Sequence, residues 1–263
     1  MTWNGYSLAR YGRHARTVAV LALLIAVAAW QCEVSLSDLV RGIVKGLSML
    51  SLFLPPDWSA FSEMVRPALV TVVICLIATP MGAALSIVFG LAGARNVAPA
   101  WLRMISRSLI AAERGLPEIV ILLILVAAFG LGPFAGIMAL AIGSVGMLGK
   151  LVGDAVEEID ARILDSAAAV GATRLQVIRH VILPEILPSM VSNSIFRFEV
   201  NIRASVLLGA VGAGGIGFEL NAAINQLEYS RATVAALTSL ALVFLSERVS
   251  DYLRERILTG ELA

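Results

Sequence analysis

Charged and polar residues inside an apolar stretch are the most chemically informative feature of the sequence. The run 187–211 is interrupted by four such side chains, Arg197, Glu199, Asn201 and Arg203. A charge at membrane depth is costly, so these side chains should face the interior of a helix bundle or a water-filled path. Glu199 and Arg203 are four apart and can pair on one helix face. Two interpretations stay open: a salt bridge that fixes helix packing, and a basic side chain that helps an anionic solute to pass.

A second charged segment precedes the apolar run 116–129. It contains Arg114, Pro117 and Glu118, and Pro117 can break or kink a helix there. Irregular backbone at membrane depth is tolerated where it is buried or lines a cavity. We therefore place these three residues on or near a solute path.

A glycine-rich segment, 212–217, satisfies the G-x-G-x-x-G pattern of dinucleotide-binding proteins. The strand and the βαβ unit that this pattern requires are not predicted around it, so the match is false. We interpret Gly212, Gly214 and Gly215 as a non-helical turn at the outer end of a span, which allows tight packing or forms a mobile gate.

Side chains for catalysis or metal binding are not grouped in the sequence. His14 and His180 are isolated, and Cys32 and Cys75 are far apart without a CxxC spacing. A membrane enzyme would need a clustered set of nucleophile and base, so this class is disfavoured, and we expect no metal or cofactor on this chain.

Composition indicates an all-α integral membrane protein. The 263 residues are 59% hydrophobic and only 15% charged, well above the apolar share of a soluble domain. Because a span needs about 17–25 apolar residues, the chain can hold about six spans and no soluble domain beside them. The net charge of +1 argues against nucleic-acid binding.

Six apolar runs are the candidate spans: 17–32, 67–93, 116–129, 134–149, 187–211 and 233–245. The first can also be interpreted as a signal peptide, but we prefer an uncleaved span. Lys and Arg gather in alternate short loops, which predicts that both termini are cytoplasmic. These loop cations are Arg10, Arg13, Arg16, Arg95, Arg103, Arg107, Lys150, Arg162, Arg174, Arg179, Arg248, Arg254 and Arg256.

The segment 36–50 has apolar residues at helical spacing with charges on the other face, and we expect the helix to stop at Pro55 and Pro56. This pattern predicts an interfacial helix on the outer leaflet, or a helix packed on its neighbours. Residues 1–60 would then comprise the tail, the first span and this helix.

The loop 160–185, between the fourth and fifth spans, predicts two short helices. Asp160 can cap the first, Gly171 fits the left-handed position that ends it, and Thr173 with Gln176 forms a capping box for the second. Pro184 marks the end of the second helix. Leu175, Ile178 and Val181 can form an apolar stripe, so the hairpin is suited to a groove on another protein.

This loop resembles the EAA loop of ABC import permeases: Glu-Ala-Ala, three residues, Gly, nine residues, then Ile-x-Leu-Pro. Asp165, Ser166 and Val181 are mild departures from the pattern. A plain connector, or a DNA-reading helix-turn-helix with no room for a duplex, are the weaker alternatives. The resemblance implies that the ATPase-coupling residues are Asp165, Ser166, Ala167, Gly171, Arg174, Gln176, Arg179, Leu183 and Pro184.

Further segments resemble the permease subunit of phosphonate importers, the PhnE family. They are 114–118, 130–136, 149–151, 157–160, 196–203 and 211–219. The resemblance implies a type I (MetI-like) permease in a bacterial inner membrane, with residues 61–263 as its transmembrane domain.

The same resemblance implies a homodimer, two cytoplasmic ATPases, and a periplasmic or lipid-anchored binding protein that delivers a phosphonate, phosphite, hypophosphite or phosphate. The sequence lacks a Walker A motif, so ATP and Mg would belong to the ATPase and this chain would not be an enzyme. An importer for another small solute, or an ion-coupled secondary transporter, stays as the alternative.

Overall fold

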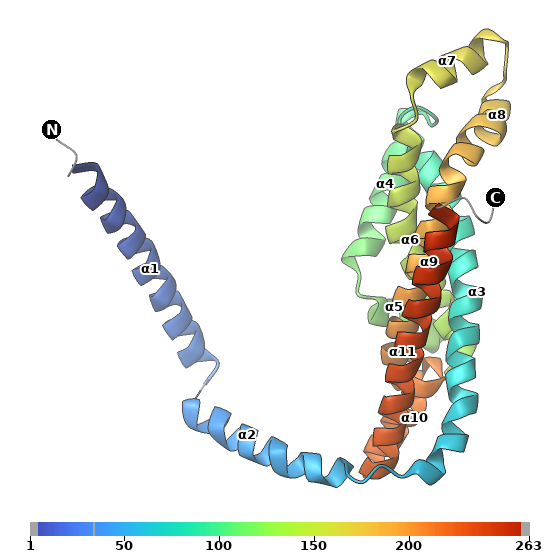
Figure 1. Ribbon diagram of the computed structural model, residues 1–263. Helices are drawn as coiled ribbons and strands as arrows, with labels where there is room; N and C mark the ends of the chain where they lie inside the picture. The colour runs from blue at the N-terminus through green and yellow to red at the C-terminus, as the bar shows by residue number, and fades with distance from the viewer. Residues whose placement is uncertain (1–4, 34, 259–263) are drawn as a thin grey trace. The chain divides into compact units, whose positions relative to one another are not determined.

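The computed structural model describes residues 5–33 and 35–258, and within these ranges every regular element is a helix. The chain divides into two compact units, Met1–Leu54 and Pro55–Ala263. We describe each unit separately (Figure 1). The division lies slightly before the boundary at residue 60 that we placed from the sequence.

The first unit contains α1 (Gly5–Gln31), α2 (Leu36–Leu50) and the short 3-10 helix η1 (Ser51–Phe53). α1 includes an apolar stretch, His14–Gln31, long enough to cross a membrane. In α2 the Ser35 hydroxyl accepts the backbone N–H of Asp38 at 3.3 Å, which caps the helix. The predicted amphipathic helix is thus confirmed as a helix, although it ends before the two prolines, and its membrane location stays a prediction.

The second unit is a helical bundle that carries the remaining predicted spans and the loop between the fourth and fifth of them. Its elements are η2 (Trp58–Ala60), α3 (Phe61–Gly93), α4 (Ala100–Gly115), α5 (Glu118–Phe129), α6 (Pro133–Glu157), α7 (Ala161–Ala169), α8 (Arg174–Val177), the π-helix η3 (Ile178–Ile182), α9 (Leu183–Leu208), the π-helix η4 (Gly209–Ala213), α10 (Ile216–Asn225) and α11 (Tyr229–Leu258).

Four helices in the described ranges are long and apolar enough to cross a membrane, and a fifth span forms if the bent pair 174–213 and 216–225 counts as one. The apolar run predicted as a span at 116–129 is a helix of only 12 residues, α5. Such a helix is about 18 Å long, so it cannot cross a hydrocarbon core of about 30 Å by itself.

The structure corrects our assignment of Arg103, Arg107 and Lys150 to short loops. Lys150 lies within α6, whereas Arg103 and Arg107 lie on α4, which packs against α3 and α6 (Figure 1). The inner face of α4 is fixed by Ser106, whose hydroxyl donates to the Phe89 carbonyl at 2.5 Å, and by the buried Ile110. A search for uncharged apolar runs misses this helix because polar residues contribute to its inner face. These residues nevertheless recur at regular helical spacing.

α3 and α6 form the most extensive helix pair of the bundle, and glycines allow them to approach closely. A Cβ added at Gly90 would lie 2.5 Å from Cγ1 of Val152, and one added at Gly82 would overlap Ser144. Without a hydrophobic driving force between helices in lipid, close backbone packing of this kind holds spans together.

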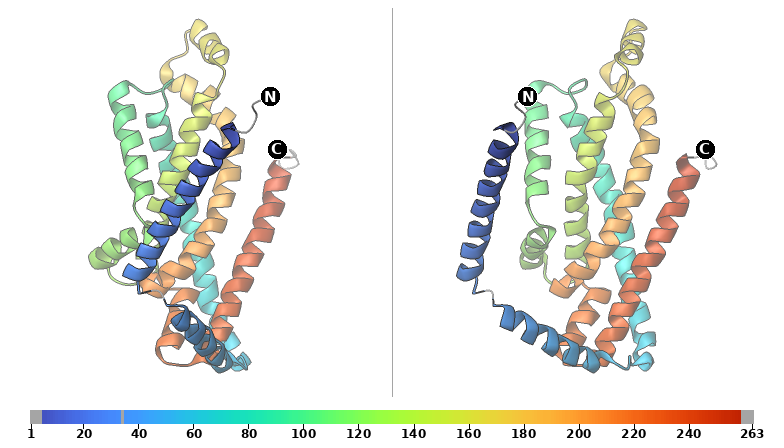
Figure 2. Two further views of the ribbon diagram at one scale, coloured as in Figure 1. Left: turned by 90° about the vertical axis from the view of Figure 1, so that its left-hand side faces the viewer. Right: turned by 60° about the vertical axis from the view of Figure 1, so that its left-hand side comes forward.

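The two ends of the bundle carry different elements. α7 and α8 stand at one end and α10 at the other, with α9 running between them (Figure 2). The main core cluster lies between these ends and draws on α3, α5, α6 and α9, with Cys75, Leu122, Leu140 and Ile202 among its buried members.

Candidate functional site

The hairpin 160–185 folds as its caps predict. The Asp160 carboxylate accepts the backbone N–H of Arg162 at 2.9 Å and begins α7. Gly171 has φ +79°, and its N–H donates to the Ala168 carbonyl at 2.9 Å, which closes the helix end. The Thr173 N–H donates to Oε1 of Gln176 at 2.8 Å within the capping box of α8.

Asp160 and Arg162 also form an exposed ion pair at 2.6 Å. The side-chain and backbone hydrogen bonds from Arg162 lower the pKa of Asp160, and the carboxylate raises the pKa of the Arg162 guanidinium. Asp160 therefore remains an ionised helix cap throughout the neutral range.

Pro184 does not end the second helix of the hairpin, contrary to our prediction. α8 continues through the π-helical turn η3 into α9, so Pro184 lies in the first turn of α9. Proline has no backbone N–H to donate, and the wider π turn directly before it accommodates the interrupted ladder. The second helix of the hairpin is thus an unbroken extension of α9.

The hairpin turns one side to the bundle and leaves the other exposed. Ile182 and Ile186 are buried against Val152 and Val156 of α6. At the tip, Val170 is 84% exposed and Leu175 is 75% exposed. Ile178 and Val181 are half-buried, so the stripe that we predicted with Leu175 is split between the two sides.

Most of the predicted coupling residues lie on the exposed side. Ala167 and Leu183 are half-buried, and the others are exposed: Asp165, Ser166, Gly171, Arg174, Gln176, Arg179 and Pro184. On the side toward the bundle, the loop 95–99 lines a pocket together with Ala168 and Arg174, whereas Val170 and Leu175 are exposed. The structure therefore presents a free surface where the sequence predicted a docking hairpin.

A buried ion pair joins two of the predicted pathway residues. Nη2 of Arg197 on α9 lies 2.6 Å from Oε1 of Glu118 on α5, and the Arg197 side chain is 5% exposed. Nε of Arg197 donates to Oγ of Ser144 on α6 at 3.0 Å. The absence of a side chain at Gly143 leaves space for the Glu118 carboxylate, because a Cβ at this position would lie 3.0 Å from Oε1 of Glu118.

Asn201, one turn further along α9, extends this contact into a polar cluster. It is completely buried, and its amide donates to Oγ1 of Thr79 at 2.9 Å and toward Oγ of Ser144 at 3.4 Å. Its Oδ1 has no hydrogen-bond partner among the described residues. Burying such groups is costly unless they are paired, so the cluster fixes how α3, α5, α6 and α9 fit together.

Glu199 and Arg203 form the ion pair that their spacing predicts. The Glu199 side chain is buried, whereas that of Arg203 is 52% exposed. Of the two arginines on α9, Arg203 is therefore the one whose guanidinium remains accessible.

Three members of this region were missed by the sequence analysis. Thr79 and Ser144 complete the polar cluster, and the Glu113 carboxylate packs against the backbone of Gly146, where a Cβ would overlap it. Hydroxyls in apolar helices are too common to be informative alone. The glycines 143, 146, 149 and 153 on α6 were the available signal, because they mark one helix face with room for other side chains.

The remaining predicted pathway residues lie elsewhere. Pro117 caps α5, and the exposed Arg114 lies in a separate pocket near Lys150. Gly212, Gly214 and Gly215 have φ of +115°, +80° and +73° and form the predicted non-helical turn between α9 and α10. The hydroxyl of Thr71 accepts the Ile216 N–H at 2.9 Å just after this turn.

Comparison with known proteins places these features in context. Residues 86–259 match the family described as binding-protein-dependent transport system inner membrane component. The chain is 35% identical over 254 residues to the phosphite transport system permease protein PtxC of Stutzerimonas stutzeri, covering 96% of this chain and 92% of that protein.

A second relative is the phosphate-import permease protein PhnE of Mycolicibacterium smegmatis, with 38% identity over 217 residues, which are 82% of this chain and 41% of that protein. Among solved structures, an inward-facing MetNI methionine ABC transporter chain aligns with a TM-score of 0.66 and 22% identity, covering 76% of this chain and 99% of that chain. This likeness confirms the predicted all-α, MetI-like permease fold.

Proposed function

The chain belongs to the family of binding-protein-dependent transport system inner membrane components and is a permease subunit of an ABC importer, and we propose that it carries a small phosphorus oxyanion. Phosphite, phosphonate and phosphate belong to this chemical class. As a transport subunit it is not an enzyme. The relatives named for phosphite and phosphate import support this substrate class.

One structural relationship carries the proposal for coupling. The hairpin 160–185 connects α6 to α9, and the same two helices hold Ser144, Arg197 and Asn201 of the buried polar cluster (Figure 1). Because η3 continues into α9 without a break, a force on the hairpin acts directly on the helix that carries Arg197. Two ATPase subunits that grip the hairpin would thus move the cluster as they close.

The accessible cation for the solute is Arg203. Arg197 is buried and neutralised by Glu118, whereas half of the Arg203 side chain is exposed beside its partner Glu199. A guanidinium binds oxyanions through parallel N–H donors, and a solute can compete for it with Glu199. Gly212, Gly214 and Gly215 would gate the outer end of this path.

The assembly proposed here is a homodimer of permeases with the path between them, two ATPases that bind ATP and Mg, and a binding protein on the opposite side. The hairpin end of the bundle is rich in Arg, with Arg95, Arg162, Arg174 and Arg179, so it would face the cytoplasm. Both termini would lie on that side of the bacterial inner membrane.

Uptake into proteoliposomes tests the proposal. Vesicles that contain the permease with its ATPase should take up phosphite, in the presence of the binding protein, only when ATP reaches the ATPase. Arg203→Gln should lower this uptake at least tenfold, while Arg66→Gln, a matched change outside the cluster, should not. Uptake that persists on an ion gradient without ATP would instead favour a secondary transporter.

A further inference from the structure

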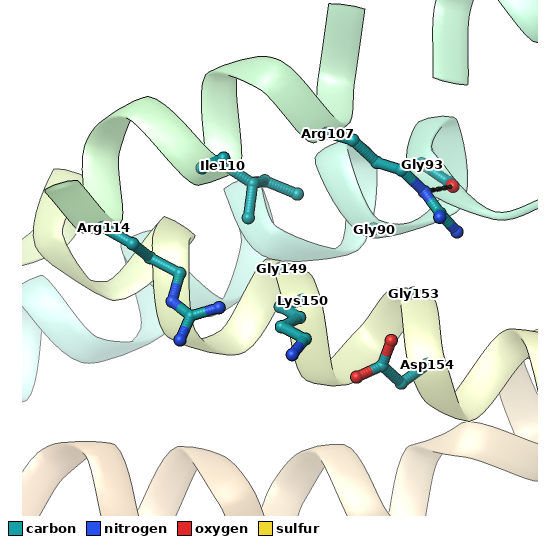
Figure 3. Close-up of a pocket in the computed structure, with 10 residues that line it drawn as sticks. Gly90, Gly93, Arg107, Ile110, Arg114, Gly149, Lys150, Gly153 and Asp154 are labelled. Atoms are coloured by element: carbon teal, nitrogen blue, oxygen red, sulfur yellow. Dashed lines mark hydrogen bonds between the residues drawn. The ribbon is translucent and has the colours of Figure 1, made fainter. Parts of the chain in front are cut away.

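A second charged region, outside the polar cluster, lies between α3, α4 and α6. It is a pocket of about 230 Å³ whose backbone lining comes from four glycines, Gly90 and Gly93 on α3, and Gly149 and Gly153 on α6. Arg107 and Arg114 enter from α4, and Lys150 and Asp154 from α6 (Figure 3). The pocket can hold a tetrahedral oxyanion together with several waters.

The four charged side chains are not equivalent. Arg107 is already satisfied, because its Nε donates to the Gly93 carbonyl at 2.8 Å and its Nη2 pairs with Glu157 at 2.5 Å. Among the described residues, Arg114, Lys150 and Asp154 form no ion pair. These three side chains line the same pocket, Arg114 from α4 and Lys150 and Asp154 from α6 (Figure 3).

All three residues are exposed, so the lack of ion pairs matters because of where Lys150 and Arg114 lie along their helices. Lys150 lies seven residues before Glu157, the last residue of α6, which corresponds to about 10 Å along the helix. Arg114 lies near the end of α4 that is farther from the hairpin. Cations at such positions in a membrane protein face a water-filled cavity or an anion, because hydrocarbon would not solvate them.

We propose that this pocket binds a phosphoryl oxyanion, with Arg114 and Lys150 contacting its charged oxygens. Arg114 would supply two parallel N–H donors and Lys150 a point charge. Asp154 would repel a fully ionised anion but can accept the hydrogen of a P–OH group. The site therefore selects a monoprotonated oxyanion, such as hydrogen phosphate or a phosphonate monoanion, over a fully ionised one or sulfate.

Such an anion has two sources: a free oxyanion that has crossed the membrane, and the phosphate of a lipid headgroup. The position of the pocket toward the hairpin end of α6 makes a free anion leaving the transport path the expected ligand. The choice of a free anion as the ligand rests on the proposed function, whereas the ability of the pocket to bind an oxyanion does not.

The experiment uses the assembled permease and ATPase complex, without ATP or binding protein, in nanodiscs of phosphatidylcholine. Binding of radiolabelled phosphate and phosphite is measured by equilibrium dialysis. Arg114→Met and Lys150→Met should each raise Kd at least tenfold, whereas Lys45→Met, which removes the other lysine of the chain, should leave it unchanged. Asp154→Asn should reduce the preference for monoprotonated over fully ionised phosphite across pH 5.5–8, the range in which phosphite loses its last P–OH proton.

Ala111→Leu provides a second route, because it fills the pocket without touching a charge. It should lower anion binding in a complex that retains its melting temperature. A parallel experiment uses nanodiscs with phosphatidylglycerol. If the variants lose only bound anionic lipid, the pocket is an anion site whose ligand is the phosphate of a lipid headgroup.

Wild-type binding of both the free anion and the lipid in Arg114→Met, Lys150→Met and Ala111→Leu would overturn the site. This outcome is separate from a failure of the proposed function, because it is measured without transport. If a variant loses uptake but its pocket still binds the anion, the defect lies in the path at Arg203 and not in this pocket.

Discussion

Arg197 and Glu118 are 79 residues apart in the sequence and form an ion pair of 2.6 Å that links α9 to α5. The two partners differ in access to water, since the Arg197 side chain is buried and that of Glu118 is 29% exposed. Removal of one partner therefore has a different consequence from removal of the other.

We expect Glu118→Gln to destabilise the bundle by about 3 kcal/mol, because it leaves a buried guanidinium without a counter-ion. Arg197→Met should cost less, since the Glu118 carboxylate can turn toward water, and the double variant should recover most of the loss. Denaturation of the purified complex measures these differences. Additive effects in the double-mutant cycle would show that the pair has no coupling energy.

The hairpin turn at Gly171 provides a test of coupling that leaves the bundle intact. Its φ of +79° is accessible to glycine and tolerated by asparagine, but it is strained for a β-branched residue. Gly171→Val should therefore uncouple ATP hydrolysis from uptake, and Gly171→Asn should retain most activity.

ATPase activity of the assembled complex and pull-down of the ATPase are the measurements for these variants. Neither substitution causes a steric clash at the Cβ, because a Cβ at Gly171 would have no neighbour within 4 Å. Equal activity of the two variants would mean that the left-handed turn is irrelevant to coupling.

The contact between α3 and α6 should be sensitive to a single methyl group. Gly90→Ala places a Cβ 2.5 Å from Val152 Cγ1 and 3.0 Å from the Gly149 carbonyl, so it should destabilise the bundle by about 1–3 kcal/mol. Val152→Ala in the same chain should restore little of that loss, because its Cβ, 2.6 Å from the added methyl group, remains. Gly115→Ala, where a Cβ meets nothing within 4 Å, is the matched control and should be neutral or stabilising.

Asp160 predicts how the hairpin responds to pH. Its pKa is lowered by the hydrogen bonds from Arg162, so its contribution is present above the unfolded pKa and is lost as the pH falls through the lower, folded pKa. The loss of this contribution therefore begins only as the pH falls to about 3.8, the ordinary pKa of an aspartate side chain, which is below the physiological range. The start of α7 should therefore be unchanged by pH between about 5 and 8.

Hydrogen exchange at the amides of the first turn of α7 measures this effect. Asp160→Ala should accelerate exchange there throughout pH 5–8, whereas Asp160→Asn should preserve the cap and lose only the ion pair. A change in protection between pH 5 and 8 in the unaltered protein would contradict the assignment of Asp160 as the cap.

Local chemistry was enough to determine the hairpin from the sequence. Asp160, Gly171, Thr173 and Gln176 each act within a few residues of their own position, so their spacing predicted both short helices and the turn between them. The pair Glu199–Arg203 was predictable for the same reason, because four residues are one helical turn.

Hydropathy likewise predicted the all-α membrane fold. It misjudged α4, whose inner face combines the buried Ile110 with polar contacts of Ser106 and Arg107. It also could not show that α5 is too short to span. Pro184 was misread because proline is compatible with the first turn of a helix when a π turn precedes it.

By itself the sequence determined which segments are helical, which are apolar enough for a membrane, and which charges lie in them, since these properties depend on near neighbours and composition. Only the tertiary structure decided that Arg197 pairs with Glu118 and is buried, while Arg203 stays half-exposed and Arg114 joins Lys150 in another pocket. The reason is that these partners lie on different helices, and the glycines of α3 and α6 set how closely those helices approach.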